Sequence, residues 1–429
     1  MVDLSVMSPL ALAAAILPFT AACVDGRDAT PTRSLAATAD VRGREMQARF
    51  ANTDVPAAVV AVVDREGYLQ FESHGLLGGD PDRPVGPDSV FDIASMTKAV
   101  TSTAALQLVE RGLVGLDEPL ETILPALREI GITRKDGSIV AATRPLTLRD
   151  LLRHTAGFGY FFNSPVIMAQ LQVDPTSGWP RPEEVAEGTY DWGFGVQPRR
   201  VFEAGERWHY GRNLGIVGRL VERLSGEDLD TYFKHHIFEP LGMDRTGYNL
   251  PSAVLEDRVP IAMRVPGTGT FLALQMPRAV PMERFYGGGE LMSSPRDYAR
   301  FLRCLLDGGE LDGVRILGVE YTAMFMRDQL PAGLAIALDP MPGRPPAERS
   351  FTDDFDDGYS FAFAIEAGEP DGLRPPGVGY WSGIHNTYYT IDPTRGVAIM
   401  FFSQIQPFDD AEAYELYRTW EDLIYRDLR

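Results

Sequence analysis

The stretch "FDIASMTKAV", Phe91–Val100, places a serine and a lysine three residues apart. The apolar pattern from Ala94 to Arg111 predicts a helix that ends at Gly112, so Ser95 and Lys98 would lie one turn apart on one face. A serine hydroxyl becomes a strong nucleophile only when a base removes its proton, and a lysine can act as that base only when it is neutral. Ser-x-x-Lys is also common on ordinary helix surfaces, so the rest of the sequence has to decide between the two interpretations.

Composition and charge limit the class of protein. The chain has 429 residues, of which 45% are apolar, enough for one large domain or two medium ones. A net charge of −20 disfavours nucleic acid as a partner, because a polyanion would be repelled. The two cysteines, Cys23 and Cys304, form no disulfide framework. None of the six histidines has the spacing of a metal site, and no dinucleotide fingerprint or G-x-S-x-G elbow is present, so we expect no metal and no cofactor.

Strand patterns occur at both ends of the chain, and helical patterns occupy the middle. The predicted strands are 57–64, 68–75, 361–368, 378–392 and 396–404. The clearest predicted helices are 146–157, 213–226, 294–309 and a last helix with apolar residues from Ala413 to Leu428. The simplest arrangement is an α/β fold with a sheet built from N- and C-terminal strands and flanked by helices. A mostly helical region is then inserted at about 113–285.

The N-terminus differs from the rest of the chain. Residues 8–23, "SPLALAAAILPFTAAC", are an uncharged apolar run that is too short to span a membrane comfortably. Its small residues before Cys23 favour a signal or lipoprotein signal over 1–23, followed by a linker at 24–39 and the main domain at 40–429. The protein would then be exported, either periplasmic or tethered to a membrane through Cys23. The alternative is a packed N-terminal helix in a cytoplasmic protein, because the first seven residues lack Lys and Arg and include Asp3.

Six stretches in order carry a resemblance to a known family. They are "SMTK", "LTLRDLLRHTAGF", "FEAGERWHYGRNLGIVGRLVE", "FEPLGMDRTGY", "YGGGELMSSPRDYARFL" and "GYWSGIHNTYYTIDP". Together they resemble the serine β-lactamase and penicillin-binding-protein family, and within it the class C-like branch of esterases and related hydrolases. The resemblance covers about residues 40–429 and implies the serine β-lactamase fold.

The resemblance also implies catalytic roles. Ser95 would be the acylated nucleophile, and Lys98 its partner. Tyr210, in "WHYGRN", matches the tyrosine of the family's Tyr-x-Asn motif and would carry the proton between Ser95 and the leaving group, as a phenolate or as a hydroxyl. The sequence departs from that motif, because Arg212 stands third and Asn213 comes one residue later. Both are expected near the substrate, and the part that the asparagine plays is left open.

The family's Lys-Thr-Gly motif is matched by Trp381-Ser382-Gly383. Gly383 would let the strand approach the substrate closely, and the resemblance implies an oxyanion hole formed by the backbone N–H groups of Ser95 and Ile384. Trp381 removes the lysine that binds the carboxylate of a β-lactam, which favours neutral esters. Ser382 and His385 complete the predicted substrate-binding set, although His385 is better explained as part of the pocket wall.

These observations predict a cofactor-free serine hydrolase that cleaves carboxylic esters through an acyl-enzyme on Ser95. Its partner would be a small ester or amide. The alternatives within enzymes are a β-lactamase, a DD-peptidase or D-aminopeptidase, and an acyltransferase that passes the acyl group to an alcohol or amine. The alternative outside enzymes is a binding protein that is acylated once and does not turn over. The natural substrate, the acyl length and the oligomeric state do not follow from the sequence.

Overall fold

The computed structural model describes residues 35–171, 199–265, 267–274, 281–337, 351, 357–368 and 372–429. The predicted signal segment at 1–23, including Cys23, lies outside the described residues. Residues 35–39, which were predicted as the end of a linker, are instead the start of helix α1 (Leu35–Phe50). Leu35, Met46 and Phe50 of this helix are buried in the core, and this burial explains why the main domain includes residues before 40.

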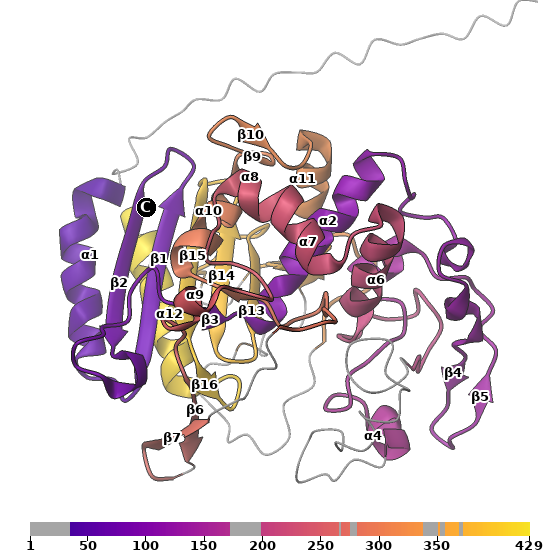
Figure 1. Ribbon diagram of the computed structural model, residues 1–429, viewed down its shortest axis with the longest axis horizontal. Coiled ribbons are helices and arrows are strands. Elements are labelled where there is room, and N and C mark those ends of the chain that lie inside the picture. The colour runs from indigo at the N-terminus through magenta and orange to yellow at the C-terminus, as the bar shows by residue number, and fades with distance from the viewer. Residues whose placement is uncertain are drawn as a thin grey trace, which may run out of the picture. The chain divides into compact units, whose positions relative to one another are not determined.

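Seven strands of the described chain form one antiparallel sheet, in the order β11-β12-β13-β14-β15-β1-β2 (Figure 1). Their bounds are β1 (Ala57–Asp64), β2 (Leu69–Gly75), β11 (Gly358–Tyr359), β12 (Ala364–Ile365), β13 (Gly379–Gly383), β14 (Thr387–Asp392) and β15 (Val397–Ser403). Strand β1 is apolar on both faces and pairs with β15, with Val60 opposite Phe401. This pairing confirms the predicted sheet built from both ends of the chain.

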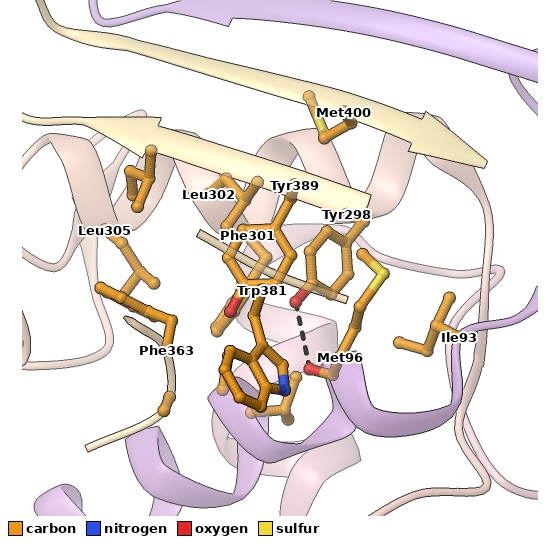
Figure 2. Close-up of a cluster of buried hydrophobic side chains, with 14 of the residues drawn as sticks. Ile93, Met96, Tyr298, Phe301, Leu302, Leu305, Phe363, Trp381, Tyr389 and Met400 are labelled. Carbon is orange, nitrogen blue, oxygen red and sulfur yellow. Dashed lines mark hydrogen bonds between the residues drawn. The ribbon is translucent and has the colours of Figure 1, made fainter. Parts of the chain in front are cut away.

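Helices cover both faces of this sheet. On β14, Tyr388 stacks on Tyr417 of helix α12 (Ala411–Asp427), with ring centroids 5.0 Å apart. The next residue, Tyr389, contacts Tyr298 of helix α10 (Pro295–Leu306), with centroids 5.7 Å apart. Because adjacent residues of a strand point to opposite faces, α12 covers one face and α10 the other. Figure 2 shows the core on the α10 side, where Tyr389, Tyr298 and Trp381 lie close together.

The remaining elements surround this framework. The other described strands pair in small sheets and are β3 (Phe91–Asp92), β4 (Ile132–Thr133), β5 (Ile139–Val140), β6 (Ile261–Val265), β7 (Thr270–Leu274), β8 (Met292–Ser293), β9 (Glu310–Leu311), β10 (Val314–Arg315) and β16 (Ile405–Gln406). The other described α-helices are α2 (Thr97–Glu110), α3 (Leu148–Leu152), α4 (Pro165–Leu171), α6 (Asn213–Ser225), α7 (Leu229–Phe233), α8 (Glu239–Leu241), α9 (Ser252–Leu255) and α11 (Val319–Phe325). Among the residues described, no helix is long and apolar enough to cross a membrane.

Two predicted elements differ from the structure for local reasons. The predicted strand 378–392 is two strands, β13 and β14, because the chain turns between Gly383 and Thr387 with Asn386 at a φ of 58°. The predicted helix 146–157 shortens to α3, since His154, with a φ of 59°, cannot continue a right-handed helix. Both positions lie beside the site described below.

Gly383 lies where β13 meets the chain that precedes Ser95. A Cβ at this position would lie 2.4 Å from the carbonyl oxygen of Ile93 and 2.4 Å from Thr387 Oγ1. We expect Gly383→Ala to lower the free energy of unfolding by about 1–3 kcal/mol, the usual cost of overpacking. Gly86→Ala is the control, because a Cβ there meets nothing within 4 Å, and it should change stability by less than about 0.5 kcal/mol. Urea unfolding measures both, and equal stability of the two variants would contradict the close approach.

Candidate active site

Ser95 and Lys98 meet at the start of helix α2. Ser95 lies in the 3-10 turn η2 (Ala94–Met96), which leads directly into α2, and the preceding Ala94 has a φ of 44°. Lys98 Nζ lies 3.0 Å from Ser95 Oγ and donates a hydrogen bond to the carbonyl oxygen of Gly288 at 2.6 Å. The spacing seen in the sequence is therefore a direct contact between the amine and the hydroxyl.

The lysine is buried rather than exposed on a helix surface. Its side chain is fully excluded from solvent, and this burial lowers the pKa of Lys98 well below its usual value of 10.5. The neutral amine is the form that burial favours. A neutral amine 3.0 Å from the Ser95 hydroxyl can accept its proton, which is what a general base has to do.

The ring of Tyr210 also lies against the Lys98 side chain. Lys98 Nζ is 4.8 Å from the centre of the Tyr210 ring, and this ring is 5.2 Å from that of Trp381 on β13. Burial, together with the nearby Tyr160, raises the pKa of Tyr210 well above 10.0, while its Ser95 and Trp381 neighbours act in the opposite direction as hydrogen-bonding groups. At neutral pH the tyrosine is therefore a hydroxyl. Of the two forms considered from the sequence, the structure favours the phenol over the phenolate.

Strand β13 closes the site, since it packs directly against η2 (Figure 2). Trp381 is buried between Tyr210 and Tyr359, with ring centroids 5.2 and 5.3 Å away. Ser382 is buried as well. Ile384 lies at the start of the turn after Gly383, and the approach of Gly383 to the Ile93 carbonyl brings this turn next to η2.

Two side chains that the sequence did not single out hold this turn. Gln406 Nε2 donates to the carbonyl oxygen of Ile384 at 3.1 Å and to His385 Nδ1 at 2.9 Å. Ser403 Oγ donates to the carbonyl oxygen of Asn386 at 2.8 Å. His385 is thus fixed by Gln406 and half-buried, as expected of a residue in the pocket wall. Neither Gln406 nor Ser403 belongs to a motif, so no local pattern could have identified them.

Arg212 and Asn213 lie on the opposite side, at the start of α6. Arg212 is buried at the residue before the helix. Burial raises the pKa of both Tyr160 and Tyr286, and the charge of Arg212 opposes this rise. Asn213 is fully buried, and its Nδ2 donates to His154 Nδ1 at 2.7 Å. The predicted contact of Asn213 with substrate stays a prediction, because its amide nitrogen is bonded to His154, while its buried amide oxygen has no hydrogen-bond partner among the described residues.

The glycine run 287–289 has a second role beyond close packing. A Cβ on Gly287 would lie 2.5 Å from the carbonyl oxygen of Leu214, so the absence of a side chain here lets two chain segments approach. Thr101 Oγ1 donates to the Gly287 carbonyl at 2.6 Å, and Gly288 supplies the acceptor for Lys98. This acceptor was not predicted, because a backbone carbonyl carries no sequence signal. No group of three or more His, Cys, Asp or Glu residues within the described ranges is arranged to hold a metal ion.

A family model described as Beta-lactamase matches residues 43–422. The chain belongs to the beta-lactamase family. This finding confirms the family and the fold expected from the motifs. Monacolin J acid methylbutanoyltransferase of Aspergillus terreus is 30% identical over 86% of this chain and 92% of its own length. Lovastatin esterase of Penicillium rubens is 28% identical over 89% of this chain and 96% of its own length.

Solved structures of related proteins have the same fold as this chain. Simvastatin synthase from Aspergillus terreus superposes with a TM-score of 0.74 at 25% identity, over 90% of this chain and 98% of its own. EstCE1, a hydrolase with promiscuous acyltransferase activity, superposes with a TM-score of 0.68 at 19% identity, which bears on the fold alone. The chain thus belongs to an enzyme family whose relatives include both acyltransferases and an esterase.

The depressed pKa of Lys98 makes stability depend on pH. Between the lowered pKa of Lys98 in the folded protein and its usual pKa of 10.5, the unfolded chain binds more protons at this residue. Keeping Lys98 neutral therefore costs no folding stability above pH 10.5, and it costs more as the pH falls below that value. We expect the free energy of unfolding of Lys98→Met, relative to wild type, to increase steadily as the pH is lowered from about 10 to about 7. Urea unfolding at several pH values measures this difference, with Lys135→Met at an exposed position as the control. A difference that does not change with pH would contradict a depressed pKa.

Proposed function

We propose that this protein is a serine hydrolase that cleaves carboxylic esters through an acyl-enzyme on Ser95. The observation that carries the proposal is the buried amine of Lys98, 3.0 Å from the Ser95 hydroxyl. Few structural roles account for a solvent-excluded lysine whose strongest contacts are a serine hydroxyl and one carbonyl oxygen, whereas a general base needs this placement.

In the proposed acylation, Lys98 takes the proton of Ser95 Oγ as the oxygen attacks the ester carbonyl. The backbone N–H groups of Ser95 and Ile384 stabilise the negative charge that develops on the carbonyl oxygen. Tyr210 then gives its hydroxyl proton to the departing alcohol and regains a proton from Lys98, so the pair returns to a neutral amine and a phenol. In deacylation, water gives its proton to the same pair and attacks the acyl carbon, and the carboxylic acid leaves as Ser95 regains its proton.

The proposed substrate class is a neutral ester. Trp381 gives the site an indole where the family's lysine would pair with a carboxylate, and it packs against Tyr210, Tyr359 and Phe351. Aromatic walls of this kind favour apolar acyl or aryl groups. The net charge of −20 adds a background that repels anions.

Acyl transfer to an alcohol is the second candidate. It is favoured by the relative named monacolin J acid methylbutanoyltransferase, which matches over 92% of its own length. Both activities use the same acyl-enzyme and differ only in whether water or an alcohol attacks it. A β-lactamase, a peptidase and a single-turnover binder are further alternatives. A p-nitrophenyl ester series of increasing acyl length, run with and without an added alcohol, separates hydrolysis, acyl transfer and a single acylation, because each gives a different product pattern, and nitrocefin run in parallel tests for a β-lactamase.

Ser95→Ala should abolish both turnover and covalent labelling by a fluorophosphonate, because it removes the attacking oxygen. Mass spectrometry of the labelled wild-type protein should locate the adduct on the peptide that contains Ser95. Ser102→Ala is the matched control, since Ser102 lies on helix α2 directly after the turn of Ser95, is fully buried and donates instead to the carbonyl oxygen of Phe361. An acyl adduct on another residue would refute the assignment.

Tyr210→Phe removes the hydroxyl that carries the proton but keeps the ring. We expect kcat to fall at least ~10²-fold, the scale of general acid–base catalysis, with the melting temperature little changed. Steady-state kinetics with p-nitrophenyl butyrate measures the change. Turnover at the wild-type rate would mean that another group carries the proton.

Trp381→Lys tests the preference for neutral esters. A charge-assisted pair with a substrate carboxylate is worth about 1–3 kcal/mol, so the ratio of kcat/KM for nitrocefin to that for p-nitrophenyl butyrate should rise about 5- to 150-fold. Trp381→Phe is the control, since it loses the indole without adding charge and should leave this ratio nearly unchanged. Wild-type protein that hydrolyses nitrocefin as fast as the butyrate ester would refute the esterase proposal.

A further inference from the structure

His154 lies at the centre of contacts to the segment that carries Tyr210. It follows α3 in the "LLRHTAG" stretch, is fully excluded from solvent and has a φ of 59°. Its carbonyl oxygen accepts a hydrogen bond from the backbone N–H of His209 at 2.9 Å. Its Nδ1 accepts from the backbone N–H of Gly211 at 3.2 Å and from Asn213 Nδ2 at 2.7 Å. One histidine therefore binds the residue before Tyr210, the residue after it and the side chain three residues later.

These contacts define the state of the imidazole ring. Two donors converge on Nδ1, so the ring is neutral and carries its proton on Nε2. Burial is the main cause that lowers the pKa of His154 well below 6.5, which agrees with a neutral ring. The ring also lies 4.8 Å from that of Tyr210, at an interplanar angle of 42°. His154 touches Tyr210 but no contact joins it to Ser95 or Lys98.

Close backbone packing also restricts the segment around Tyr210, in addition to its hydrogen bonds to His154. A Cβ on Gly211 would lie 2.2 Å from the carbonyl oxygen of Phe158, so the backbone here passes as close to its neighbour as a glycine allows. A proton carrier has to be held within a fraction of an ångström of its productive place, and this holding is the work of surrounding hydrogen bonds. The backbone N–H groups of His209 and Gly211, on either side of Tyr210, both donate to His154, and Asn163 Nδ2 donates to the carbonyl oxygen of Tyr210 at 2.7 Å.

We propose that His154 is a positioning residue that holds the Tyr210 hydroxyl toward Ser95, and that Asn213 acts through His154 rather than on the substrate. The proposal rests on the proposed proton transfer by Tyr210. It explains why the asparagine stands one residue later than in the Tyr-x-Asn motif. At that position its amide meets the histidine behind Tyr210.

A pair of substitutions separates positioning from simple packing. His154→Asn keeps an acceptor oxygen close to the place of Nδ1, and asparagine tolerates a positive φ. His154→Leu keeps most of the volume and removes the acceptor. We expect His154→Leu to lower kcat at least ~10-fold while KM changes less than ~3-fold, and His154→Asn to restore kcat to within ~5-fold of wild type. Should the leucine variant fail to fold, His154→Gln, which moves the acceptor away from the place of Nδ1, takes its place in the comparison.

The deciding measurement is a double-mutant cycle with Tyr210→Phe, using full-length protein and p-nitrophenyl butyrate. If His154 acts through Tyr210, His154→Leu should change kcat less than ~2-fold in the Tyr210→Phe background. Equal losses in the two backgrounds, or an unchanged kcat for His154→Leu in the wild-type background, would overturn the inference alone. Normal turnover by Tyr210→Phe itself would overturn both the proposed role of Tyr210 and the inference.

Discussion

The structure depends on one constraint, which is that the amine of Lys98 must be kept from water. A charged ammonium is costly to bury, so the protein surrounds a side chain that stays neutral. Helix α2 is buried along nearly its whole length, with α6 on one side, and strand β13 packs against the turn η2 that leads into it. The glycine run 287–289 comes close enough for a backbone carbonyl to receive the amine.

Local periodicity was enough to predict the framework. The elements that formed where their apolar patterns predicted them are strands β1 and β15 and helices α2, α6, α10 and α12. The turn inside 378–392 was missed because "SGIHN" is flanked by apolar residues on both sides and lacks a Pro-Gly or Asn-Gly signal. The split into β13 and β14 follows from contacts with Ile93 and with the 403–407 segment, and both are distant in sequence.

In the candidate site, too, local sequence patterns predicted some residues, while others depend on contacts between distant parts of the chain. Ser95 and Lys98 were found from their spacing, while Tyr210 and Trp381 were placed beside them only by resemblance to a family. Residues that hold these groups, such as Gln406 and Gly288, were not found, since their function lies in where one carbonyl or amide meets another. The presence of esterases and acyltransferases among the relatives fits a framework in which acylation is fixed by the core and the attacking molecule is chosen elsewhere.

The pairing of β1 with β15 also bears on how the protein is made. A ribosome releases β1, the turn η2 with Ser95 and helix α2 long before it releases β13 and β15, which lie close to the other end of the chain. Until those strands emerge, the apolar strand β1 lacks its partner β15, and the turn η2 beside Lys98 lacks its contact with β13. Folds that rely on such distant contacts form slowly, and their early strands are exposed to aggregation. The proposed acylation of Ser95 should therefore begin only after β13 and β15 have left the ribosome.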